Sequence, residues 1–247
     1  PQSYRVPKAV QNIANSILQQ IPDDRKLSKM WQPRSEEGSV QRVTSLDDVP
    51  MEQGTWLVLG RTHSKLQSLK EPLCERGIYY EYKNRRSYHE RLFRNILNYE
   101  RWREGTLLSL TECRDLFEFL NKEFTNVEER LYDLKEFGYS ITQRWYEVFE
   151  THPEESLYIR LMRQNGEELS KTPRVKLSTI HAAKGGEADN VLLILDNTKK
   201  IRESVEKNDD KRDEEHRVWY VGVTRTKQNL YIMEAKKERN GYEIETI

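Results

Sequence analysis

The sequence predicts an α/β fold, in which a mainly parallel sheet is interrupted by an inserted all-helical segment. The run 191–195 is wholly apolar, as is typical of a parallel strand covered on both faces. Other strand-like runs lie on both sides of a stretch, 88–150, whose apolar residues have only helical spacings. A chain of 247 residues is long enough for one domain or two.

The first predicted elements are a helix and a weak strand. Apolar residues recur over 8–21 at intervals that place them on one face of a helix, and Pro7 and Pro22 flank this segment. The segment 23–50 is polar and is expected to connect elements, with one edge strand at 40–44.

A strand, a loop, a helix and a second strand are expected next. The run 55–59 is a predicted strand, and a three-residue loop, 61–63, follows it. A single helix then carries leucines at positions 66, 69 and 73 on one side and ends at Gly77. The second strand occupies 78–82.

The segment 88–150 is predicted to be helical because three groups of apolar residues have helical spacing. The groups are Leu92, Phe93, Ile96 and Leu97; Leu116, Phe117, Leu120 and Phe124; and Ile141, Trp145, Val148 and Phe149. The part 83–103 also mixes basic and aromatic residues. This mixture suits contact with a nucleic-acid backbone, or an amphipathic helix with a solvated basic face.

Strands return after Pro173. We expect strands at 175–179, 191–195 and 230–233, with a helix through Val218, Trp219 and Val221 before the last of them. The charged run 199–213 is interpreted as a solvated loop, with docking of a partner as the alternative. Residues 1–87 and 173–247 are therefore expected to form the sheet domain, and residues 88–172 the helical insertion.

The composition excludes several functional classes. Lys and Arg total 41, as do Asp and Glu, so any site for a polyanion has to be local. No long apolar run or signal segment occurs, so we expect a cytoplasmic protein with no membrane partner. The two cysteines and five histidines do not cluster as a metal site requires, so no protein-bound metal is expected. The chain opens at Pro1 without an initiator Met, which suggests a fragment of a longer polypeptide.

One loop carries residues suited to ligand binding. Thr179, His181, Lys184, Gly185 and Glu187 are expected at the carboxyl end of a strand, where open α/β sheets bind ligands. The glycine permits close approach of a ligand, the lysine supplies a cation, and the glutamate can accept hydrogen bonds from sugar hydroxyls. An ordinary loop with a glycine turn is the alternative.

A second segment, 214–225, places two arginines on one helix. Arg217 and Arg225 are eight residues apart and so lie roughly along one line of a continuous helix. An arginine against the γ-phosphate of a nucleotide accelerates its hydrolysis by about 10³ to 10⁵. A solvated arginine on an exposed helix is the alternative, and the residues alone leave both open.

Four stretches, in this order, resemble the motifs of one enzyme family. QSYR at 2–5, LVLGRTH at 57–63, STIHAAKGGE at 178–187 and EEHRVWYVGVTR at 214–225 are similar to motifs IV, IVa, V and VI of the UvrD/Rep family of superfamily 1 DNA helicases. The resemblance implies a RecA-like motor domain, the family's domain 2A, with the insertion in the place of its subdomain 2B. It also implies an ATP-dependent helicase that moves 3′ to 5′ on single-stranded DNA and acts at junctions with duplex.

The resemblance assigns five residues to ATP. Tyr4 would stack on the adenine, and Arg5 and Arg225 would be the catalytic arginines that contact the γ-phosphate. Glu187 would lie near the ribose, with Gly185 shaping the loop beside it.

The resemblance assigns five other residues to single-stranded DNA. Arg61 would contact a phosphate, while Thr62, His63, Thr179 and His181 would donate hydrogen bonds. These side chains suit tracking of the backbone without base readout.

The sequence departs from the family pattern at several positions. Gly186 and Ala188 stand where motif V usually has Leu and Phe, and Ser3 and His63 stand where Asn is usual. No Gly-x-x-x-x-Gly-Lys-Ser/Thr loop occurs, so ATP with Mg²⁺ would need an upstream 1A domain carrying that loop and the Mg²⁺ ligands. The chain alone is not expected to hydrolyse ATP. A non-catalytic helicase-like module that binds DNA or protein, and the helicase half of a helicase-nuclease, are the alternatives.

Overall fold

The computed structural model describes residues 6–26, 32–183, 185–235 and 240–244. Contacts divide the chain into two compact units. Unit 1 comprises Pro1–Arg85 and Glu168–Ile247, and unit 2 comprises Arg86–Glu167. The boundaries expected from the sequence, after residues 87 and 172, differ from these by a few residues.

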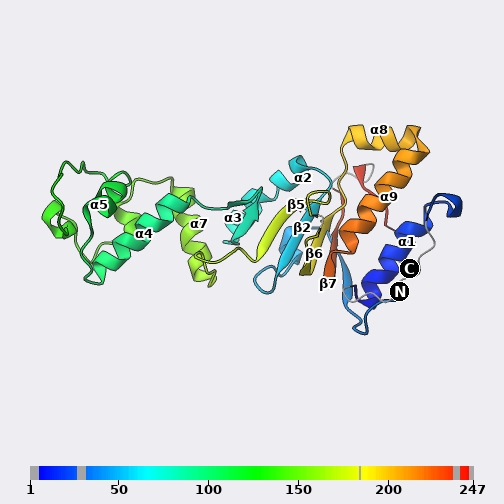
Figure 1. Ribbon diagram of the computed structural model, residues 1–247, viewed down its shortest axis with the longest axis horizontal. Coiled ribbons are helices and arrows are strands. Elements are labelled where there is room, and N and C mark those ends of the chain that lie inside the picture. Colours follow the sequence, from blue (N-terminus) through cyan, green and yellow to red (C-terminus); the bar gives the residue numbers. More distant parts are fainter. Residues whose placement is uncertain (1–5, 27–31, 184, 236–239, 245–247) are drawn as a thin grey trace. The chain divides into compact units, whose positions relative to one another are not determined.

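A seven-stranded sheet of order β1-β7-β6-β2-β5-β3-β4 organises the fold (Figure 1). The strands are β1 (Ser39–Val43), β2 (Trp56–Gly60), β3 (Tyr80–Tyr82), β4 (Arg85–Arg86), β5 (Val175–Thr179), β6 (Ala188–Ile194) and β7 (Thr226–Met233). From β1 to β3 every neighbouring pair is parallel. The predicted α/β, RecA-like fold class is confirmed, and all the strands expected from the sequence occur near their expected positions.

Helices cover both faces of this sheet in unit 1. Helices α1 (Lys8–Gln19) and α9 (Asp209–Val223) pack with one set of alternating strand residues, which includes Leu57 and Leu59. The other set, which includes Trp56 and Val58, packs with α2 (His63–Gln67) and α3 (Lys70–Glu75). Strand β2 is therefore buried along its whole length.

The helix predicted to end at Gly77 is two helices, so that prediction was wrong in its continuity. Helix α2 ends at Gln67, and α3 begins at Lys70. Pro72 has no amide hydrogen to donate to the carbonyl of Ser68, so the ladder of hydrogen bonds is broken between them. Two 3₁₀ helices, Asp23–Arg25 and Leu46–Asp48, lie in the connecting segment 23–50.

The prediction of a loop over 199–213 was wrong. This run forms helix α8 (Lys199–Lys207) and the start of α9. The Thr198 hydroxyl accepts a hydrogen bond from the amide of Ile201, and the Asn208 side chain accepts one from Lys211, so both helices have polar N-caps. Opposite charges four residues apart, such as Lys199 and Glu203, stabilise α8 although none of its residues is buried.

Unit 2 is less helical than predicted. Its helices are α4 (Glu90–Arg103), α5 (Leu110–Phe117), α6 (Trp145–Val148) and α7 (Pro153–Gln164), with a 3₁₀ helix at Leu134–Phe137. The third group of apolar residues, between 141 and 149, therefore forms only the short helix α6. Between α5 and α6 the chain is mostly irregular, and a cluster of aromatic rings packs there: Phe117, Phe124, Tyr132, Phe137 and Tyr139.

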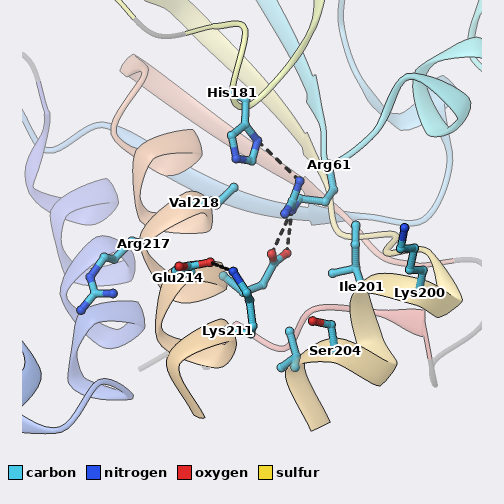
Figure 2. A pocket seen from close by; sticks show the side chains of 11 residues that line it. Arg61, His181, Lys200, Ile201, Ser204, Lys211, Glu214, Arg217 and Val218 are labelled. Atoms are coloured by element: carbon cyan, nitrogen blue, oxygen red, sulfur yellow. Dashed lines mark hydrogen bonds and ion pairs between the residues drawn. The ribbon is translucent and has the colours of Figure 1, made fainter. Parts of the chain in front are cut away.

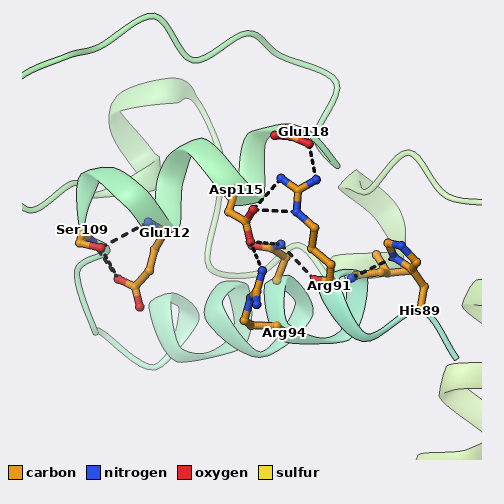
Figure 3. Close-up of polar contacts among 9 residues, drawn as sticks. His89, Arg91, Arg94, Ser109, Glu112, Asp115 and Glu118 are labelled. Carbon is orange, nitrogen blue, oxygen red and sulfur yellow. Dashed lines mark hydrogen bonds and ion pairs between the residues drawn. The ribbon is translucent and has the colours of Figure 1, made fainter. Parts of the chain in front are cut away.

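The basic side chains of α4 are paired with acidic side chains of α5 and the residue after it. Arg91 contacts both Asp115 and Glu118, and Arg94 contacts Asp115 at 2.6 Å (Figure 3). The interpretation of 83–103 as an amphipathic helix is favoured, because much of its basic face is neutralised within unit 2.

Candidate functional site

The connection between β5 and β6, residues 180–187, joins the two edges of the sheet. Thr179 and Ile194 both align with Gly60, so they lie at the carboxyl edge. Ala188 lies six positions before Ile194 on β6, at the opposite, amino edge. Since each strand residue spans roughly 3.3 Å, the connection covers roughly 20 Å along the strands.

This geometry corrects one expectation. Gly185 and Glu187 were expected at the carboxyl end of a strand together with Thr179 and His181. Only Thr179 and His181 lie near that edge, while Glu187 directly precedes Ala188 at the amino edge. The reason is topological, because the next parallel strand has to begin where the previous one began.

Three predicted DNA-binding residues lie at the carboxyl edge with exposed or partly exposed side chains. Arg61 follows β2, His63 begins α2, and His181 follows β5. An Nη1 atom of Arg61 lies 3.5 Å from Nδ1 of His181 (Figure 2). Nδ1 of His63 lies 3.2 Å from the hydroxyl of Tyr82.

The two predicted threonines use their hydroxyls differently. The Oγ1 atom of Thr62 is buried and has no hydrogen-bond partner among the described residues. The Oγ1 atom of Thr179 accepts a hydrogen bond of 3.3 Å from the amide of Ala182, which helps to form the turn after β5. Both threonines are therefore directed into the protein rather than towards the surface.

The amino edge brings together residues assigned to the nucleotide. The amide of Ala188 donates to the carbonyl of Arg225 at 3.3 Å, so Glu187 and Arg225 are close in the backbone. The Glu187 carboxylate is ion-paired with Lys227 at 2.6 Å. Gly185 has φ +87°, a conformation that favours glycine, and a Cβ there would meet nothing within 4 Å. A ligand thus has open space beside Gly185.

A cavity of about 300 Å³ is lined by residues of both the connection and α9. It is lined by Ile180, His181, Arg217, Val218, Val221 and Arg225. Arg217 and Arg225 thus share it, although α9 ends at Val223 and Arg225 follows the helix. Nε of Arg225 donates to the carbonyl of Val221 at 3.0 Å.

A glycine in α9 permits the close approach of helix, sheet and connection. A Cβ on Gly222 would lie 3.1 Å from a methyl group of Leu193 and 3.4 Å from one of Ile180. A larger side chain there would push α9 away from the connection. The predicted residues Tyr4, Arg5 and Lys184 lie outside the described residues.

Sequence reasoning missed three charged residues. Glu215 is buried on α9 and contacts Arg61, Lys200 lines a cavity beside them, and Lys227 pairs with Glu187. A signal existed for one of them, since Glu215 and Trp219 are four residues apart on a predicted helix and can contact each other.

The part of the chain that the structure describes contains neither a cluster of metal ligands nor a membrane-spanning helix. No three His, Cys, Asp or Glu side chains there come together as metal ligands. None of its helices combines the length and the hydropathy needed to cross a membrane.

Comparison with known proteins gives consistent similarities. Residues 103–237, more than half of the chain, match the family model of the UvrD-like helicase C-terminal domain. Over 76 residues the chain is 40% identical to proteins described as probable DNA helicase II homologues in Rickettsia conorii and Rickettsia felis, and to DNA helicase II of Rickettsia typhi. Each match covers 28% of this chain and only 11% of the relative's length.

One solved structure is also similar to the chain. It is the C-terminal domain of a possible DNA helicase from Lactobacillus plantarum, with a TM-score of 0.39 and 13% sequence identity. The match covers 94% of this chain and 86% of that one.

Proposed function

The chain belongs to the UvrD-like helicase C-terminal domain family, and on that premise we propose that it is the 2A motor part of an ATP-dependent helicase that translocates 3′ to 5′ on single-stranded DNA and unwinds duplex at a junction. In this proposal, closing and opening of a cleft against a 1A domain couples ATP hydrolysis to movement along DNA.

The observation that carries the proposal is the arrangement of one connection and one helix between two edges. The connection 180–187 starts beside His181 and ends at Glu187, and α9 runs beside it towards Arg225. In this proposal, a displacement of the connection or of α9 at one edge of the sheet is transmitted to the other edge. A motor requires such a mechanical connection between its nucleotide-binding site and its DNA-binding site.

On the nucleotide side, Arg225 is the proposed arginine finger. Its guanidinium carries a permanent charge and would stabilise the negative charge that develops on the transferred phosphoryl group. Glu187 would accept hydrogen bonds from the ribose, in competition with Lys227, and Gly185 leaves room for the ligand. Arg5 is proposed as the second arginine, and Tyr4 as the ring that stacks on adenine.

The phosphate-binding loop and the ligands of Mg²⁺ are proposed to belong to the 1A domain. Mg²⁺ would neutralise phosphate charge during hydrolysis. Without that loop the chain is expected to be inactive alone. Unit 2 is proposed as a reduced counterpart of the family's 2B subdomain.

On the DNA side, Arg61, His63 and His181 are the proposed contacts at the carboxyl edge. Nitrogen donors of these types suit phosphate oxygens and carry no base-specific pattern. Thr62 and Thr179 would join them only after their buried hydroxyls turn outwards.

The replacement Arg225→Ala tests the nucleotide side in the complete protein with its 1A domain. We expect ATP binding to be largely retained, while kcat of the DNA-stimulated ATPase falls by about 10³-fold or more, because only the transition state loses an interaction. Binding of a fluorescent ATP analogue and steady-state ATPase rates measure the two effects.

Arg217→Ala is the matched control, since it removes an equal charge from the same cavity. The Arg217 side chain donates to the carbonyl of Arg25 at 2.7 Å, and the control variant is expected to keep most of its kcat when DNA is saturating. Near-normal turnover in Arg225→Ala would contradict the assignment, as would equal losses in both variants.

A further inference from the structure

A buried carboxylate lies directly behind the proposed DNA-binding edge. Glu215 is on α9, and its side chain is only 5% exposed. Both of its carboxylate oxygens accept hydrogen bonds of 2.9 Å from Nε of Arg61. Oε1 also accepts a hydrogen bond of 2.8 Å from the indole of Trp219. A buried carboxylate is stable only when it is paired in this way, so its position is tightly fixed.

These contacts fix the orientation of the Arg61 guanidinium. Glu215 occupies Nε, and Nη1 lies near His181, while Nη2 has no protein partner among the described residues (Figure 2). An arginine recognises a phosphate best through two parallel N–H donors. Holding the guanidinium by Nε leaves Nη2 for the phosphate, together with Nη1, whose one contact among the described residues is the long one to His181.

The cavity beside these residues has the charge that a phosphate needs. It measures about 460 Å³, and α8 contributes Lys200 and Ser204 to its lining. Within the lining, Arg61 is paired with Glu215 and Lys211 with Glu214. Lys200 and Arg217 also line the cavity, so its lining has four Lys or Arg residues and two Glu residues, although the Arg217 guanidinium is directed to the carbonyl of Arg25.

We propose that Glu215 is a positioning residue, which sets the Arg61 guanidinium to bind a backbone phosphate of single-stranded DNA in the cavity between α8, α9 and the carboxyl edge. This inference rests on the proposed function and adds to it the residue that orients the phosphate contact. Because Glu215 belongs to the helix that Arg225 follows, it also ties the DNA contact to α9.

The variant Glu215→Gln, made in the complete protein, tests this proposal because positioning and simple electrostatics predict opposite changes in DNA affinity. Removing a negative charge near DNA should, by electrostatics alone, strengthen binding. If Glu215 positions Arg61, the variant instead weakens binding, because the neutral amide holds the guanidinium less well. We expect about a tenfold higher concentration of oligo-dT for half-maximal ATPase stimulation, with kcat at saturating DNA and KM for ATP little changed.

Glu214→Gln is the matched control. Glu214 is the neighbouring residue, lines the same cavity and carries the same charge, but it is paired with Lys211. This variant should bind oligo-dT as well as the wild type or better. Equal weakening in both variants would overturn the proposal, and so would a change confined to KM for ATP.

A double-mutant cycle distinguishes positioning from a general structural role. Glu215→Gln should add no further loss of DNA binding to Arg61→Ala, because the residue to be positioned is then absent. Additive losses would overturn the proposal. If Glu215→Gln does not fold, Trp219→Phe removes the other hydrogen bond to the carboxylate and keeps an aromatic ring against Tyr242. It should weaken binding in wild-type Arg61 but not in the Arg61→Ala background, and an equal effect in both would overturn the proposal.

The response of the wild-type protein to oligo-dT distinguishes failure of this inference from failure of the proposed function. A wild-type protein whose ATPase does not respond to oligo-dT and that does not bind it would overturn both. A wild type that responds, with Glu215→Gln indistinguishable from it, would overturn only the positioning role.

Discussion

His216 lies next to the positioning residue on α9 and fixes the segment after β7. Its Nδ1 atom lies 2.6 Å from the hydroxyl of Tyr242, whose ring stacks on Trp219. Burial lowers the pKa of His216, and the charges of Arg212 and Arg217 act in the same direction, against the opposing effect of Asp213. The folded protein therefore holds this imidazole neutral.

The lowered pKa predicts a loss of stability in mild acid. The unfolded chain takes up a proton at this histidine as the pH falls below about 6.5, while the folded chain resists it, so protons favour unfolding. The stabilisation by the neutral imidazole is complete above that pH and decreases below it. His216→Asn removes the titration, and its Tm should fall less steeply than that of the wild type between pH 7 and pH 5. Parallel Tm profiles would contradict this.

The sequence assigned roles to residues only where a motif carried them. His181 lies on the connection expected after 175–179, whereas Glu187 lies at the amino edge and Arg225 follows α9 instead of belonging to it. Their assigned roles stay predictions, and the structure brings Arg225 close to Glu187. Glu215 was not assigned, because its importance depends on Arg61, which lies 154 residues away in the sequence. No local pattern reports a partner at that separation.

At the scale of elements, α4 and α5 are joined by a shared carboxylate. Burial alone would raise the pKa of Asp115, but hydrogen bonds from Arg91, Arg94 and Asn95 lower it to about 2. Several donors thus converge on one anion, which makes it worth more than an isolated surface ion pair.

Asp115→Asn should therefore destabilise the protein. We expect a loss of about 1–2 kcal/mol at neutral pH, measured by denaturant unfolding followed in unit 2. The difference between variant and wild type should diminish as the pH falls from about 3.8 to about 2, where the folded carboxyl becomes protonated. Glu128→Gln, at an exposed ion pair with Arg130 in the same unit, is the control and should change stability by less than about 0.5 kcal/mol.

Elements were predictable where apolar residues repeat. The strands β2, β5, β6 and β7 and the helix α1 follow from periodicity, because burial selects their residues. Helix α8 was missed, because capping residues and ion pairs stabilise it without a buried face.

At the scale of the whole molecule, the two units have separate cores. No described residue of unit 2 belongs to the two clusters that cover the faces of the sheet. We therefore expect unit 1 to fold when residues 86–167 are replaced by a short Gly/Ser linker. Cooperative thermal unfolding with retained near-ultraviolet circular dichroism would support this expectation, whereas a broad transition without tertiary signal would contradict it.

The neutral net charge also has a meaning at this scale. The total charge combines regions of different character. Arg91 of α4 is paired with Asp115 of α5, whereas the lining of the cavity beside Arg61 has more basic than acidic residues. Composition reports only such sums, so it did not predict where a polyanion would be attracted.

The connection 180–187 has a consequence for how this sequence can vary among related chains. Eight residues have to cover roughly 20 Å and include a turn, so little slack remains. Replacing a side chain there changes one contact, whereas inserting or deleting a residue changes the spacing between the two edges. Among relatives, this stretch should therefore tolerate substitutions more readily than changes in length, whereas the surface of unit 2 should tolerate both.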